Sequence, residues 1–207
     1  MNNNFKINKE VILLVTTLVF ITILQSCKGQ EKEPKYNSKA IELNDKAVQL
    51  VMRMEYDSAF ILFNQAIKID KNYYMPYSNM IGIYLSKKQF DKALHASDKV
   101  VAIKPDLAEG WTFGGILYDS KGDSLTAKKY YIKSIEIYDN RINNPEKKKS
   151  LTANRINRAV SLILLGKELE GKDELRELRA DNPDNLMIDE FLKINKHDYI
   201  RQLIDNE

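Results

Sequence analysis

The chain has 207 residues, of which 43% are hydrophobic and 29% charged, and its formal net charge is +3 at pH 7. With 32 basic against 29 acidic residues, the composition does not indicate the basic face that nucleic acid requires, so nucleic acid is not an expected partner. Glycine and proline are sparse, at 8 and 5 residues, and helix formers dominate, which predicts an all-helical domain.

Residues 1–26 have the pattern of a secretory signal peptide. Lys6 and Lys9 precede an uncharged apolar segment that runs from Val11 to Leu24. A membrane-spanning helix needs about 20 apolar residues, so this segment is short for a span and typical of a cleaved leader.

The single cysteine of the chain, Cys27, directly follows this leader. Leu24 lies three residues before it and the small Ser26 immediately before it, with Gln25 a less usual residue between them. This arrangement resembles the lipobox of bacterial lipoproteins. The resemblance implies that Cys27 becomes the first mature residue and carries the lipid, with two or more acyl chains such as palmitate, because one chain anchors only marginally. The alternatives are an uncut signal anchor, or an ordinary signal peptide with an incidental cysteine.

Residues 27–37 are predicted to be the acylated cysteine and a short polar tether, which Pro34 interrupts. Ten residues reach at most about 35 Å when fully extended, so the folded part is expected close to the membrane surface. Lys28 is not the aspartate that retains lipoproteins in the inner membrane of enteric bacteria. The expected location is therefore the bacterial cell envelope, at the outer membrane in preference to the inner.

Residues 38–207 are self-similar at a spacing of 34 residues, seen first in Ala59, Ala93 and Ala127. Larger side chains in the segments before these alanines repeat at the same spacing: Leu43, Tyr77 and Trp111, followed by Leu50, Tyr84 and Tyr118. A fourth copy follows after ten inserted residues, with Ala159, Gly166, Gly171 and Pro183 in the matching places. Such periodicity is typical of repeat architectures.

The third copy resembles the tetratricopeptide repeat (TPR) most closely, as Trp111-x-x-Gly114-Gly115-x-x-Tyr118 followed by Gly122, Ala127 and Tyr131. The resemblance implies an all-α solenoid of helix-turn-helix units, in which small residues allow close helix approach and Gly122 and Gly166 form turns. The expected repeats are about 40–73, 74–107, 108–141 and 152–185, and the helices that cap the stack are 186–207.

Two copies depart from this pattern. The second copy has Ile81 where a small residue is expected, which predicts a shifted helix. The fourth has Arg155 in place of a large aromatic residue and is separated from the third by a spacer, Asp139 to Leu151, in which Pro145 disfavours a continuous helix.

Residues for catalysis or metal binding are not expected. The two histidines, His95 and His197, lie about 100 residues apart, and no cysteine is available to complete a zinc site. The sequence has no glycine-rich phosphate loop and no nucleophile elbow. We therefore predict a protein that is not an enzyme and binds no cofactor, and we interpret Lys147, Lys148 and Lys149 as solvated.

The resemblance implies that the first helices of successive repeats line a groove that binds a peptide. Carried over to this chain, the groove residues are Asn44, Val48, Met52, Ser78, Asn79, Gly82, Leu85, Thr112, Phe113, Ile116 and Asp119. The subclass that grips a C-terminal carboxylate needs polar or basic groups where this chain has Val48, Glu109 and Phe113, so that specificity is not expected. The alternative is that Val48, Phe113 and Ile116 turn inward and pack.

The expected function is that of a membrane-anchored TPR lipoprotein, a scaffold or assembly factor that binds a protein or peptide of the cell envelope. The alternatives are a glycan- or peptidoglycan-associated accessory protein, which a stripe of exposed aromatic residues would favour, and a hydrolase of helical fold, which a cluster of buried carboxylates would favour.

Overall fold

The computed structural model describes residues 36–144 and 150–204. Within these ranges the chain forms helices and no strand. The helices are α2 (Ser38–Met52), α3 (Tyr56–Ile69), α4 (Met75–Ser86), α5 (Phe90–Ile103), α6 (Ala108–Ser120), α7 (Ser124–Ile142), α8 (Leu151–Leu165), α9 (Glu168–Asp181), α10 (Leu186–Lys193) and α11 (Lys196–Ile204). None of these helices is both long and apolar enough to cross a membrane. Cys27, Pro145 and the three lysines 147–149 lie outside the described residues.

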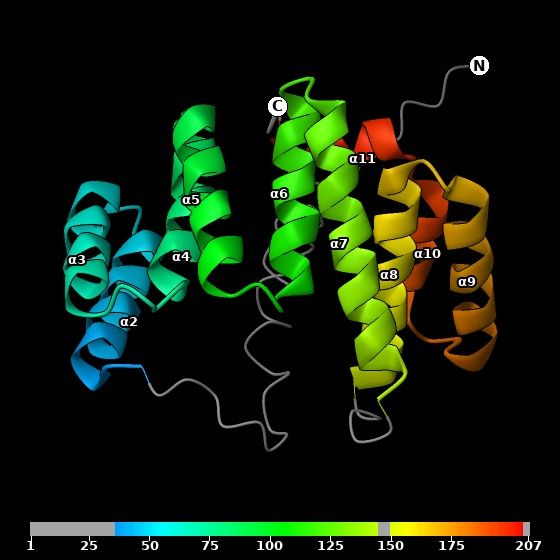
Figure 1. Cartoon of the computed structure of the whole chain (residues 1–207), viewed down its shortest axis with the longest axis horizontal. Helices are drawn as coiled ribbons and strands as arrows, with labels where there is room; N and C mark the ends of the chain where they lie inside the picture. Colours follow the sequence, from blue (N-terminus) through cyan, green and yellow to red (C-terminus); the bar gives the residue numbers. More distant parts are fainter. Residues whose placement is uncertain (1–35, 145–149, 205–207) are drawn as a thin grey trace.

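The helices pack as successive pairs: α2 with α3, α4 with α5, α6 with α7, and α8 with α9. Figure 1 shows these pairs side by side in one row, each pair joined by a short turn. This arrangement confirms the predicted all-α helix-turn-helix solenoid. The apolar interior of the row consists of three clusters of buried residues, and the half-buried Tyr77 and Tyr84 pack against two of them.

Small residues allow the paired helices to approach closely, as the spacing predicted. Ala59, Ala93 and Ala127 are completely buried. A Cβ atom added to Gly115 would lie 2.5 Å from the ring of Tyr131, and one added to Gly171 would lie 2.5 Å from the carbonyl oxygen of Ala159. These separations are far below van der Waals contact, so each glycine is required by its packing.

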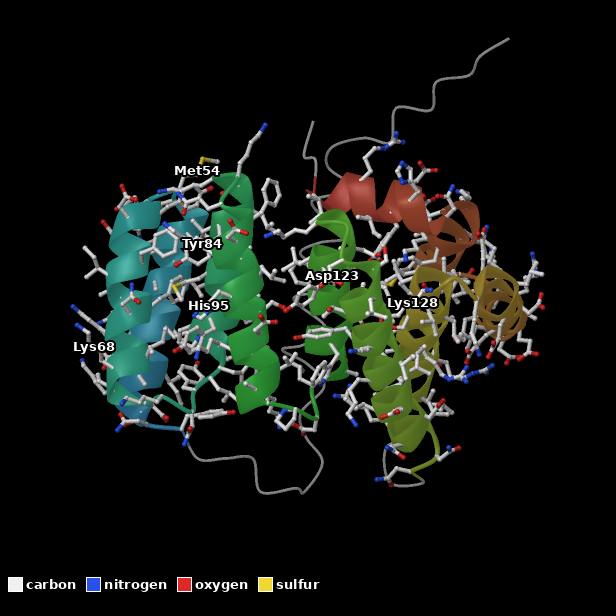
Figure 2. All side chains as sticks on the ribbon, turned by 45° about the horizontal axis from the view of Figure 1, so that its top comes forward. Met54, Lys68, Tyr84, His95, Asp123 and Lys128 are labelled. Atoms are coloured by element: carbon white, nitrogen blue, oxygen red, sulfur yellow. The ribbon has the colours of Figure 1, made fainter. Side chains whose placement is uncertain are left out.

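The turn inside each pair contains one residue in the left-handed backbone region. The prediction for Gly122 and Gly166 is confirmed, since their φ angles are 84° and 94°. The first two pairs place Met54 and Lys88 at the equivalent turns, with φ angles of 62° and 55°. Figure 2 shows Met54 at the end of its helix pair. A side chain at positive φ is strained, because its Cβ crowds the backbone, and glycine avoids this cost.

Replacing Lys88 by glycine is therefore expected to stabilise the domain by about 1 kcal/mol, since the turn is already shaped for glycine. The matched control is Gly122→Ala at the equivalent turn, which should destabilise by a similar amount. Urea unfolding measures both changes. A Lys88→Gly domain less stable than the parent would contradict the strain assigned to this turn.

The second helix of the third pair continues into the predicted spacer. The predicted repeat ends at residue 141 and the spacer begins at Asp139, and α7 ends at Ile142, so the first residues of the spacer are helical. Two contacts hold the additional turn: Tyr138 is buried, and Arg141 pairs with Glu109 at 2.8 Å and donates to the carbonyl oxygen of Asp106 at 2.7 Å. In the second pair, by contrast, a proline follows the end of α5 and disfavours further helix.

The two departures of the repeat pattern are accommodated differently. Ile81 is buried in the main apolar cluster. Arg155 replaces aromatic packing with ion pairs, to Glu174 at 3.1 Å and to Glu177 at 3.0 Å. Charged contacts on α9 thus take the place of a ring in the fourth pair.

The two terminal helices have different positions. Helix α10 packs against α9 and buries Ile188 and Phe191. Helix α11 does not extend the row beyond α9. It turns back and contacts α6, in the third pair.

Candidate functional site

Four equivalent positions, Val48, Gly82, Ile116 and Val160, define what we call the first-helix face. They lie in α2, α4, α6 and α8, the first helices of the four pairs, and are separated by 34, 34 and 44 residues, the last step including the ten-residue insertion. In a regular array such positions have the same surroundings. Their burial nevertheless divides the face into two halves.

The half formed by α2 and α4 is open. Gly82 is exposed, and a Cβ atom added there would meet nothing within 4 Å. Val48 is half-buried, and Met52, one turn further along α2, is 80% exposed. The spacing of Ile41, Val48 and Met52 places them along one side of α2, with the exposed Asp45 between the first two, so this helix presents a mixed surface of aliphatic side chains and one carboxylate.

A hydrogen bond between two asparagines joins the helices of the open half. The Nδ2 atom of Asn79 donates to Oδ1 of Asn44 at 2.9 Å. Asn44 is buried, whereas Asn79 is only half-buried. Asn44 therefore serves the contact between α2 and α4, and Asn79 keeps part of its surface available.

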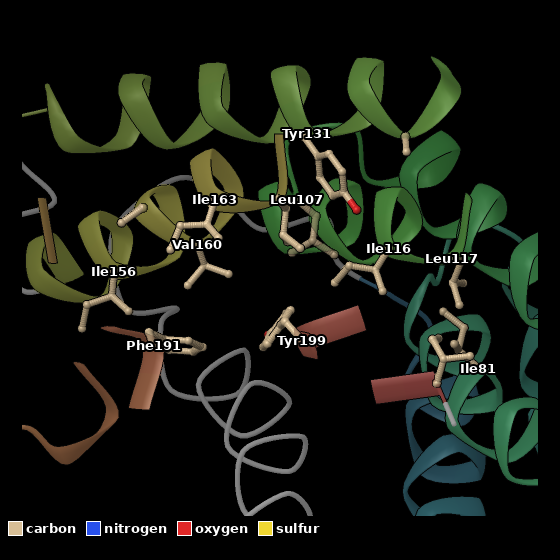
Figure 3. Close-up of a cluster of buried hydrophobic side chains, with 14 of the residues drawn as sticks. Ile81, Leu107, Ile116, Leu117, Tyr131, Ile156, Val160, Ile163, Phe191 and Tyr199 are labelled. Carbon is tan, nitrogen blue, oxygen red and sulfur yellow. The ribbon is translucent and has the colours of Figure 1, made fainter. Parts of the chain in front are cut away.

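The half formed by α6 and α8 is covered. Ile116 is 2% exposed and Val160 is 6% exposed. Figure 3 shows Tyr199 and Phe191, from α11 and α10, on the side of these two residues that faces away from Tyr131. The terminal helices therefore cover this half of the first-helix face.

Asp119, at the end of α6, is the polar centre of the covered half. Its side chain is 5% exposed and pairs with Nζ of Lys196, in α11, at 2.6 Å. It also accepts hydrogen bonds from the hydroxyls of Tyr131 and Ser124, each at 3.0 Å. The carboxylate is thus fully engaged by its own chain.

The predicted groove residues therefore separate into two groups. Val48, Met52, Asn79 and Gly82 keep accessible surface in the open half. The others are buried, bonded within the chain or packed on its apolar cluster, which makes them part of the fold: Asn44, Ser78, Leu85, Thr112, Phe113, Ile116 and Asp119. Of the residues weighed as inward-packing, Ile116 is almost completely buried, while Val48 and Phe113 are partly so.

Thr112 has a structural contact that the sequence did not indicate. Its hydroxyl lies 3.0 Å from that of Ser161 and 3.2 Å from the carbonyl oxygen of Ala108. Ser161 is completely buried, so the pair joins α6 to α8 inside the array. Polar groups in such a place need each other as partners.

Sequence reasoning missed Lys196 and Tyr199 as residues of this face. A signal for the lysine was present in the repeat alignment: Asp119 is aligned with Val51, Leu85 and Ile163, which are all apolar. A carboxylate in an otherwise apolar column needs a cation or several donors.

Burial also sets the ionisation of the tyrosines near this face. Desolvation, together with the nearby Asp119 carboxylate, raises the pKa of Tyr131 well above its usual value. Desolvation raises the pKa of Tyr199 to about 12. Both hydroxyls are therefore neutral at physiological pH and act as hydrogen-bonding or packing groups.

Metal-binding chemistry is not indicated by the residues in the described ranges. They contain no group of three or more His, Cys, Asp or Glu residues that could hold a metal ion. His95 and His197 are both exposed, on α5 and α11.

Comparison with known proteins identifies the repeat and the fold. Residues 108–141, the third predicted copy, match the tetratricopeptide repeat family. A heat shock protein sti1 homolog from Schizosaccharomyces pombe is 34% identical over 92 residues, which are 44% of this chain and 16% of that protein. An Hsp70-Hsp90 organising protein from Plasmodium falciparum is 25% identical over 142 residues, 68% of this chain and 55% of that protein. The chain therefore spans little more than half, or less, of the length of these relatives.

Among solved structures, the MamA RS-1 ArsTM double mutant aligns with 85% of this chain and 97% of its own, at 15% identity and a TM-score of 0.51. At that identity the likeness concerns the fold alone. The crystal structure of YrrB, described as a TPR protein with an unusual peptide-binding site, aligns with a TM-score of 0.49 at 14% identity, over 81% of this chain and 86% of its own. The chain thus folds as a solenoid of TPR helix pairs and contains a tetratricopeptide repeat at residues 108–141.

Proposed function

We propose that the protein is a lipid-anchored scaffold of the bacterial cell envelope that binds a protein partner through the open half of the first-helix face. The observation that carries this proposal is the accessible surface around Val48, Met52 and Gly82, on the half of the first-helix face that α10 and α11 leave uncovered. Relatives named as Hsp70-Hsp90 organising proteins support a role in bringing proteins together.

An amphipathic helix fits the chemistry of this surface better than a free carboxylate. On the open half α2 exposes the aliphatic side chains of Ile41 and Met52 beside the carboxylate of Asp45, a mixture that suits an amphipathic helix. A carboxylate reader needs free cationic groups near the face. On the open half the two lysines of α2, Lys39 and Lys46, both pair with Glu42, at 3.0 and 2.7 Å.

The partner hypothesis is tested by Gly82→Arg, which places a long charged side chain in open space on the face. Because a Cβ atom at this position meets nothing within 4 Å, the melting temperature should stay the same or rise slightly. We expect at least a tenfold loss of co-purified partner after mild crosslinking of intact membranes. The matched control is His95→Arg, at an exposed position on α5 (Figure 2), which should keep the partner.

Equal recovery of the partner with Gly82→Arg and with the parent chain would refute binding at this half. Loss of the partner from both variants would instead indicate a site that extends over the second helices of the pairs.

Attachment to the membrane is the second part of the proposal and rests on the sequence Leu24-Gln25-Ser26-Cys27. We expect mass spectrometry of the mature N-terminal peptide to show Cys27 as the first residue, carrying a diacylglyceryl group. Replacing Cys27 by alanine should release the protein from the membrane fraction, because the acyl chains supply the binding energy. An intact leader, or an unmodified Cys27, would remove the anchor from the proposal. If Cys27 is acylated, separation of the inner and outer membranes shows which of the two carries the protein.

A further inference from the structure

Helix α11 occupies a surface that is open in the first two pairs. The positions that it and α10 cover, Ile116 and Val160, are equivalent to Val48 and Gly82, which lie uncovered in the same solenoid. The first-helix face of the third and fourth pairs is therefore formed by the same repeat positions as that of the first two pairs. Its residues are buried because a segment of the same chain is bound to them.

The contacts of α11 have the form of a docked peptide. Lys196 places its ammonium group 2.6 Å from the Asp119 carboxylate and 5.5 Å from the centre of the Tyr131 ring. Three residues further on, Tyr199 is buried and packs edge-on against Phe191, with ring centres 6.0 Å apart. The charge thus fixes α11 on the surface of α6, and the ring packs it against α10.

The attachment of α11 is small for a structural element. It has nine residues, and a helix of that length is marginal on its own in water. Among its described side chains Tyr199 and Ile204 are buried and Ile200 packs against the same apolar cluster, while His197 and Arg201 are exposed. Arg201 forms its ion pair with Asp198 inside the same helix, at 2.9 Å, which adds nothing to the docking.

Removal of α11 leaves a surface prepared for a similar helix. Tyr131 and Ser124 continue to hold the Asp119 carboxylate in place, and Ile116 lies next to it on the same helix, one turn away. Release of α11 would expose the Asp119 carboxylate to water, and its charge would still favour a replacement ligand with a basic group.

We infer that α11 is a releasable internal ligand, and that an amphipathic helix carrying a basic residue three positions before an aromatic residue replaces it on α6. This inference rests on the proposed function and specifies the chemistry of the partner. Release of α11 would make the covered half of the first-helix face accessible to it. Local release is expected from the small attachment, because such segments open at lower free energy than the whole domain.

The first test uses the full chain and a labelled peptide with the sequence of residues 194–204. In the parent chain the site is occupied, so we expect the peptide to bind at least tenfold more weakly than to the Lys196→Glu, Tyr199→Ala double variant. The control peptide carries the Lys196→Glu change alone and should bind neither protein. Equal peptide affinity for the parent and the double variant, or no binding to a double variant with unchanged melting, would overturn the inference.

A second measurement decides the case in which the double variant does not fold. Native-state hydrogen exchange of the parent chain should show the amides of α11 exchanging at least 100-fold faster than those of α6. Equal protection in the two helices would show that α11 is a permanent part of the domain. Neither experiment needs the envelope partner, so its result is independent of the crosslinking test of the proposed function.

Discussion

Replacing Ala93 or Ala127 by arginine is expected to unfold the domain. Both methyl groups are completely buried where the helices of a pair meet. An arginine at either position must push the helices apart and carries its charge into an apolar interior. The expected loss is several kcal/mol, comparable with a total folding free energy of roughly 5–15 kcal/mol.

The matched control for this prediction is Ala102→Arg, because Ala102 is exposed on the same helix as Ala93. It should change the stability by less than about 0.5 kcal/mol. Circular dichroism during heating measures all three variants. Melting curves like that of the parent for both buried substitutions would show that the helix pairs do not pack through these alanines.

Alkaline pH is expected to unfold the domain, with the loss beginning near pH 10. Desolvation raises the pKa of Tyr130, Tyr131 and Tyr138 above the unfolded value of 10. Above pH 10 the unfolded chain therefore binds fewer protons than the folded chain, and stability falls as the pH rises. Below pH 10 the full contribution is present.

Well above pH 10 the expected loss is about 1.4 kcal/mol per pH unit for each buried tyrosine that stays protonated in the folded state. Between pH 10 and pH 11, where the unfolded tyrosines are only partly ionised, the buried Tyr131 and Tyr138 would together remove roughly 2 kcal/mol. Tyr130 is only half-buried, so it contributes less. Urea unfolding at pH 8, 10 and 11 measures the slope, and Tyr138→Phe should make it shallower, because it removes one of the three groups. A free energy of unfolding that stays constant up to pH 11 would contradict the burial of these hydroxyls.

The repeat spacing predicted most of the fold, because the residues that repeat are those required by contacts and turns within each helix pair. Ala59, Ala93 and Ala127 are small where helices touch, and glycine appears where the backbone turns left-handed at Gly122 and Gly166. These requirements recur in each pair, so they appear in the sequence as small residues at regular spacing. The spacing could not show that the start of the spacer is helical, because Tyr138 and Arg141 are held by contacts with α6 and the residues just before it, which the spacing does not encode.

The candidate site was less predictable, because its burial depends on a segment that is not a repeat. Ile116 and Asp119 have the sequence positions of groove residues, but α11 lies on them, and no periodicity relates Lys196 or Tyr199 to α6. Only the acidic residue in an apolar column indicated that a basic partner had to exist. Long-range docking of a terminal helix is decided by tertiary contacts, which a single sequence does not reveal.

Site-specific photo-crosslinking from position 82 tests the central claim most directly, that a protein partner binds the open half of the first-helix face. A photoreactive amino acid replaces Gly82 in one variant and His95 in another, since both positions are exposed and lie on different faces of the second pair. After irradiation of intact membranes, the account predicts a discrete protein adduct from position 82 and none from position 95. An adduct from position 95 with none from position 82 would contradict it.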